Sequence, residues 1–142
     1  MHVLDADSRF SKIVDVAMRC IRQLVKMALE HHDKVHLLIV EGNHDETASG
    51  VWLKKMFTAL YEDEVRVEVN ASELPFYMMR WGETFLGFHH GHKVKNEALP
   101  LLFAAQFREE WGQTRRAYLH CGHRHHVDEK EYNGATVIQH PT

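Results

Sequence analysis

The chain has 142 residues and a formal net charge of −3 at pH 7. This length limits it to one domain, residues 1–142, which is large enough to bury a core without disulfide bonds. The charge excludes a global positive field for nucleic acid or membranes, although a bound metal ion could supply positive charge locally. No apolar run approaches the roughly 20 residues of a membrane span. The two cysteines fit reduced thiols in the cytoplasm better than a disulfide.

The first half of the chain predicts a helix, a strand and a second helix. Apolar side chains recur at helical spacing over residues 10–29 without an interrupting glycine or proline. Cys20 lies on the apolar side of this pattern and is expected to be a small buried residue. Residues 35–40 form an apolar run typical of a strand that is buried on both faces of a parallel sheet. The second helix is predicted over about residues 48–61.

The second half predicts strands with one further helix. A helix over residues 96–110 fits the apolar spacing and tolerates Pro100 in its first turn. Cys121 is expected to face the core from a strand, and Asn133-Gly134 favours a type I′ turn between the last two strands. An alternation of strands and helices indicates the α/β class. The six runs with strand character are residues 65–69, 76–81, 84–89, 116–121, 127–132 and 135–138.

Three short strings rich in histidine each follow a predicted strand. Imidazole and amide groups are ligands of divalent transition metals. In α/β sheets, ligands bind where the carboxyl ends of strands meet. Because these strings bring such groups to strand ends, they predict a hydrolytic metal site that activates water. The strings are Gly42-Asn43-His44-Asp45, His89-His90-Gly91-His92 and Gly122-His123-Arg124-His125-His126.

The order Gly-Asn-His-Asp, His-Gly and Gly-His-x-His resembles the calcineurin-like metallophosphoesterase superfamily. The surrounding sequence is similar to its phage and prophage branch of DNA-repair-exonuclease-like phosphoesterases. This resemblance covers essentially the whole chain and implies a sandwich with αββα layers. It also implies hydrolysis of a phosphodiester or phosphomonoester by metal-activated water, with nucleic acid as the favoured substrate class and DNA as a candidate partner. The expected ion is Mn, with Mg, Zn, Fe and Ni as alternatives, and the complete enzyme holds two ions.

The resemblance also assigns metal ligands. It implies that Asn43, His90 and His123 bind the second metal ion, and that His125 binds the first. His44 is then no ligand, because the matching histidine approaches the scissile phosphate, where it stabilises the transition state or protonates the leaving oxygen.

The remaining residues of the three strings receive supporting roles. Asp45 is expected to order its loop as a cap for the following helix. Arg124 is either a ligand of a substrate phosphate or an exposed arginine. No metal role is implied for three further histidines, which we expect to be solvated or supporting residues. These are His89, His92 and His126.

The chain departs from the family pattern near its beginning. The motifs Asp-x-His and Gly-Asp-x-x-Asp, which supply the bridging carboxylate and two ligands of the first ion, are absent. Asp5 and Asp7 do not match them. The resemblance therefore implies a partial domain that is truncated at the N-terminus and at the C-terminus. Missing first strands would leave an unpaired sheet edge that favours a homo-oligomer.

Two alternatives to the phosphoesterase follow from this departure. The first is a catalytically incomplete remnant that keeps the fold and serves as a metal-binding or assembly module. The second is a structural zinc site, but the glycines in all three strings favour open loops instead.

Overall fold

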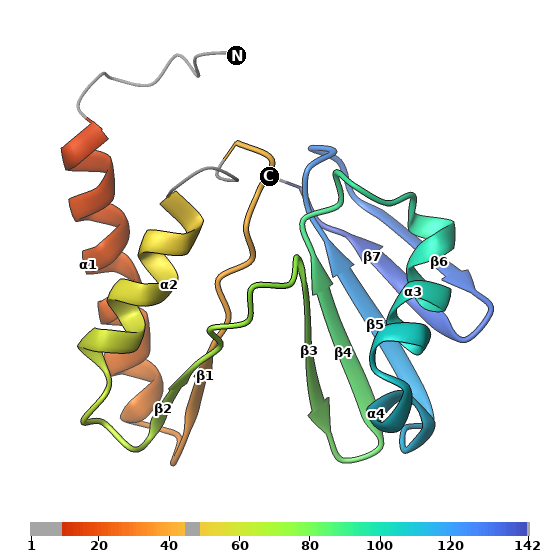
Figure 1. The fold of residues 1–142 in the computed structure, drawn as a ribbon, viewed down its shortest axis with the longest axis horizontal. Helices are drawn as coiled ribbons and strands as arrows, with labels where there is room; N and C mark the ends of the chain where they lie inside the picture. The colour runs from red at the N-terminus through yellow and green to blue at the C-terminus, as the bar shows by residue number, and fades with distance from the viewer. Residues whose placement is uncertain (1–9, 45–48, 142) are drawn as a thin grey trace.

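A computed structural model describes residues 10–44 and 49–141 and has a mixed α/β architecture, which confirms the predicted class. Figure 1 shows α1 and α2 beside a small parallel sheet, β1-β2, and a larger mixed sheet in the order β3-β4-β5-β7-β6. No helix in the described ranges is both long and apolar enough to cross a membrane. The elements are α1 (Phe10–Leu29), β1 (Val35–Leu37), α2 (Ser49–Leu60), β2 (Val67–Val69), β3 (Phe76–Trp81), β4 (Thr84–His89), the 3-10 helix η1 (Asn96–Ala98), α3 (Leu99–Gln106), α4 (Arg108–Gly112), β5 (Arg116–Cys121), β6 (Asp128–Tyr132) and β7 (Ala135–Gln139).

The first helix has the predicted length, but one prediction within it is wrong. Cys20 is exposed, whereas Val25 is buried. At about 100° per residue, Cys20 and Val25 lie on different sides of the helix, because five residues separate them. The face of α1 that packs on the rest of the chain is therefore not the one that carries Cys20.

The strand β1 is shorter and less buried than the sequence predicts. It ends at Leu37, and residues 38–40 continue the apolar run without regular strand structure. Within the described residues β1 pairs only with β2, in parallel. A strand that is buried inside a sheet has a neighbour on each side, and β1 has a neighbour on one side only. His36 is accordingly exposed and lies 3.2 Å from Glu68 on the neighbouring strand.

The main core lies between the five-stranded sheet and α3. Phe103 from α3 packs edge-on against Phe85 of β4, with ring centroids 5.9 Å apart. Both are fully buried, as is Leu119 of β5. Each such side chain contributes roughly 1.5–3 kcal/mol by its burial. The prediction that Cys121 faces the core is confirmed, since it is buried and this burial raises the pKa of its thiol to about 11.

The predicted helix over residues 96–110 is broken into three pieces. Phe107 leaves the helical conformation, with φ −121° and ψ 58°, between α3 and α4. Its ring instead packs against Phe103 and Phe85, with centroid distances of 5.9 Å and 6.1 Å. Packing this side chain into the aromatic core interrupts the helix, and α4 continues with the polar residues that follow.

The connectivity of the larger sheet brings several loops to one edge. The strands β4, β5 and β7 are parallel neighbours, so their carboxyl ends lie at the same edge, at the top of Figure 1. The segment that follows β1 reaches the same region. Two hairpins complete the sheet, β3-β4 and β6-β7, and Gly134 turns the second with φ 92°. The prediction of a type I′ turn is wrong, because that turn requires positive φ at both central residues and Asn133 does not have it.

Candidate metal centre

Side chains from all three histidine strings meet at this edge of the sheet. Asn43 Oδ1 lies 3.0 Å from His90 Nε2, although 47 residues separate them in the chain. The ring of His123 lies against that of His90, with centroids 5.1 Å apart. The amide of Gly122 donates to the carbonyl of His90 at 3.0 Å, which fixes the second and third strings to each other. The three predicted ligands Asn43, His90 and His123 therefore lie together.

The separation of Asn43 Oδ1 and His90 Nε2 is that of a hydrogen bond, and it also equals the separation of two neighbouring ligands of one divalent ion. Adjacent ligands on an octahedral ion with bonds of about 2.1 Å stand about 3 Å apart, which matches the separation of the Asn43 oxygen and the His90 nitrogen. Residues 10–44 and 49–141 contain no group of three or more His, Cys, Asp or Glu positioned to hold a metal ion. The three side chains together offer one amide oxygen, from Asn43, and the imidazoles of His90 and His123.

The third string has an unusual backbone. His123 and His125 both adopt positive φ, 76° and 55°, a region that residues other than glycine rarely occupy. Such conformations cost about 1–3 kcal/mol and persist only where the surroundings fix them. His123 is half-buried, whereas His125 and Arg124 are exposed on the same loop. The strain is thus concentrated in the segment that carries two predicted ligands.

His92 belongs to the cluster, although the sequence assigned it no metal role. Its ring centroid lies 5.2 Å from that of His90 and 6.0 Å from that of His123. Gly91, with φ 102°, turns the chain between the two histidines. A Cβ at residue 91 would lie 2.9 Å from the carbonyl oxygen of Gly122, so this turn requires glycine. The His-Gly-His spacing was the signal that could have identified His92.

His89 is buried beside the cluster, where its ring stacks on that of His92. It is 2% exposed and stacks on Phe76, with centroids 4.8 Å apart. Burial, followed by the charges of His92, His90 and Lys93, lowers its pKa to about 4, so the ring is neutral at pH 7. Its Nδ1 accepts the backbone N–H of Gly91 at 3.0 Å. His89 is therefore a supporting residue and not a solvated one.

A buried lysine holds the segment that carries Asn43. Lys54 of α2 is 4% exposed, and its Nζ donates to Tyr77 Oη at 3.0 Å and to the carbonyl oxygen of Ser72 at 3.1 Å. The same ammonium lies 3.7 Å from Glu41 Oε2, two residues before Asn43. It thus connects α2 and β3 to the loop of the first string, because each partner comes from a different segment.

A buried amide side chain likewise holds the third string in place. Gln139 of β7 is fully buried, and its Nε2 donates to the carbonyl oxygen of Gly122. Gly122 immediately precedes His123, so this bond fixes the start of the strained loop.

The other predicted site residues lie outside the contacts described so far. His44 is exposed and follows Asn43 in the same turn. Arg124 is exposed between His123 and His125. Asp45, the predicted helix cap, lies outside the described residues.

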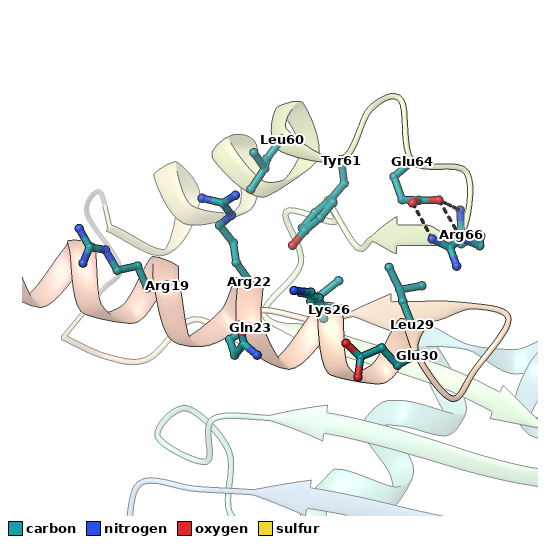
Figure 2. Close-up of a pocket in the computed structure, with 11 residues that line it drawn as sticks. Arg19, Arg22, Gln23, Lys26, Leu29, Glu30, Leu60, Tyr61, Glu64 and Arg66 are labelled. Carbon is teal, nitrogen blue, oxygen red and sulfur yellow. Dashed lines mark hydrogen bonds and ion pairs between the residues drawn. The ribbon is translucent and has the colours of Figure 1, made fainter.

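A cavity of about 670 Å³ lies elsewhere, between α1 and α2 (Figure 2). Arg22, Lys26 and Tyr61 are among the residues that line it. Burial raises the pKa of the Tyr61 hydroxyl, and the nearby charge of Arg22 opposes this effect. None of the lining residues belongs to a histidine string. The cavity is therefore separate from the candidate metal centre.

No protein-family model matches the chain, and no curated protein matches it either. The geometry of the three loops is therefore the basis on which we infer a function.

Proposed function

We propose that this chain binds a divalent metal ion through Asn43, His90 and His123 and hydrolyses a phosphoester with metal-activated water. The observation that carries the proposal is the 3.0 Å approach of Asn43 Oδ1 to His90 Nε2, beside the His123 ring. Mixed oxygen and nitrogen donors suit Mn, and Mg, Zn, Fe and Ni are the alternatives. His125 is the candidate ligand of a second ion in a complete enzyme.

In the proposed reaction, Asn43, His90 and His123 would hold the ion, which would supply an acidified water and positive charge beside the phosphate. His44, exposed beside Asn43, donates a hydrogen bond to a phosphate oxygen or a proton to the leaving oxygen. Arg124, exposed beside His123, binds a phosphate oxygen through its guanidinium. The buried neutral ring of His89 limits access of water from behind the cluster.

The arrangement of the layers supports an αββα sandwich as the proposed fold family. The helices α1 and α2 accompany the small sheet, and α3 packs on the larger one. Nucleic acid is the favoured substrate class by resemblance alone, and DNA is the candidate within it. Since the net charge of −3 provides no global attraction to DNA, recognition would depend on the metal centre and local groups such as Arg124.

The second candidate function is a metal-binding module without catalysis. It is favoured by the absence from the sequence of the motifs Asp-x-His and Gly-Asp-x-x-Asp, which supply the bridging carboxylate in the family that the strings resemble. A carboxylate that bridges two ions is part of the hydrolytic centres that the motifs resemble.

Hydrolysis of bis-p-nitrophenyl phosphate with Mn²⁺, measured together with Mn²⁺ binding by calorimetry, distinguishes the two functions. The phosphoesterase predicts hydrolysis that is lost in His90→Ala together with Mn²⁺ binding, and lost in His44→Ala with binding retained. The exposed His31 offers a matched control, because His31→Ala should leave both unchanged. Binding without hydrolysis supports the module, and absence of binding contradicts both functions.

A further inference from the structure

The cavity between α1 and α2 carries positive charge on its α1 side. Arg19, Arg22 and Lys26 extend from α1 and line this cavity of about 670 Å³. At about 100° per residue, the three positions fall within about 60° of the helix circumference and extend over about 11 Å. They therefore share one face of the helix, and we call them the α1 cation row.

Neighbouring carboxylates do not neutralise the α1 cation row. Two carboxylates line the cavity, and one of them, Glu64, is held by Arg66 at 2.9 Å. In residues 10–44 and 49–141, no ion pair joins Glu30 or another acidic side chain to the row. The three cations of the row thus outnumber Glu30 by two, although the net charge of the chain is −3. A local excess of positive charge in a cavity attracts an anion.

Tyr61 adds a hydrogen-bond donor to the same cavity. Its hydroxyl points from the end of α2 toward α1, between Arg22 and Lys26 (Figure 2). Burial raises the pKa of this hydroxyl, so it is protonated at pH 7 and can donate. Within the part of the chain that the structure describes, the hydroxyl has no hydrogen-bond partner. A half-buried donor between two cations suits a charged oxygen of a ligand.

The remaining wall of the cavity has an apolar part. Val25, Leu29 and Leu60 line it. The ring of Tyr61 also lines it and is supported by Phe57, on which it stacks with centroids 6.2 Å apart. Sites for small ligands combine apolar walls with a few convergent polar groups, and their volumes are about 300–1,000 Å³. The cavity is therefore large enough for a phosphate group together with an organic ring.

We propose that this cavity binds a phosphate monoester, with the phosphate on the α1 cation row and an organic ring against the apolar wall. A nucleoside monophosphate has both parts. Its phosphate carries a charge of about −1.5 to −2 at pH 7, which matches the excess of the row over Glu30. Arg22 is the expected main contact, because a guanidinium binds phosphate oxygens through paired hydrogen bonds. The site does not depend on the proposed metal centre, since no residue of a histidine string lines the cavity.

Calorimetric titration in the presence of EDTA tests the binding site. EDTA removes divalent ions, so a metal ion at the histidine strings contributes nothing. The probes are the monophosphates of adenosine, guanosine, cytidine and uridine, titrated separately. We expect at least one to bind at one molecule per chain, and inorganic phosphate and the free nucleoside to bind about tenfold more weakly or worse, because each lacks one of the two parts. Failure of all four monophosphates to bind, or equal binding of inorganic phosphate, overturns the proposal.

Substitutions in α1 test where the phosphate lies. Arg22→Gln should weaken binding of the tightest monophosphate by about tenfold or more, since it removes a charged donor. Lys12→Gln is the matched control and should leave binding unchanged, because Lys12 is exposed on α1 but does not line the cavity. Unchanged binding in Arg22→Gln, or an equal loss in Lys12→Gln, overturns the proposal. A short single strand of DNA that binds more tightly than every monophosphate, and loses affinity in Arg22→Gln, overturns it in favour of a nucleic-acid surface.

Discussion

Replacing Lys54 by methionine tests how the Asn43 loop is held. Lys54 is 4% exposed, and its ammonium joins Tyr77, Ser72 and Glu41. Methionine keeps the apolar stem of the side chain and removes the charged donor. The buried hydroxyl of Tyr77 and the carbonyl of Ser72 then lose their donor, and Glu41 loses its counter-charge.

The structure gives the size of this effect. A hydrogen bond from a charged donor contributes about 1.5–3 kcal/mol to stability. Lys54 makes two of them, and methionine recovers part of the loss because it needs no desolvation of a charge. We expect Lys54→Met to lower the free energy of unfolding by about 3 kcal/mol. Loosening of the Glu41 segment should also weaken Mn²⁺ binding, because Asn43 follows it closely.

Urea unfolding, followed by circular dichroism, measures the change in the free energy of unfolding. The neighbouring Lys55 is exposed and provides the control, because Lys55→Met should change stability by no more than about 0.5 kcal/mol. Equal stability of the two variants would refute the reasoning, since it would mean that the Lys54 contacts do not stabilise the fold.

Three smaller changes test the glycines and one histidine pair. Gly91→Ala should reduce Mn²⁺ affinity in a calorimetric titration, because its Cβ would lie 2.9 Å from the Gly122 carbonyl oxygen. Gly87→Ala should instead lower stability to urea by about 1–3 kcal/mol by overpacking the core. Burial, then the charge of His140, lowers the pKa of His120. Stability should therefore fall as pH drops below 6.5, and NMR should show a higher His120 pKa in His140→Ala.

The sequence predicted best those elements whose signals are local. The ranges of β3, β4 and β5 agree with prediction because alternation and turn residues define both ends of each strand. The range of α1 was equally clear, yet Cys20 was assigned to the wrong side. Helical spacing reveals apolar positions, but it does not distinguish a stripe that faces its own chain from one that faces solvent.

Errors arose where tertiary contacts decide the local structure. Among the residues that the structure describes, β1 pairs with β2 alone, and β1 ends at Leu37 although the apolar run continues. Phe107 breaks its helix because its ring packs on Phe103 and Phe85. The meeting of His90 and His123 was predictable from parallel strands that end together. The position of His92 depended on the positive φ of Gly91, which strand periodicity does not reveal.

The most direct test of the proposed metal centre is anomalous scattering from crystals grown with Mn²⁺. The account predicts one ion with bonds of about 2.1 Å to Asn43 Oδ1, His90 Nε2 and a ring nitrogen of His123. Absence of an ion at these three side chains in Mn²⁺-saturated crystals, or an ion bound without Asn43, would contradict it.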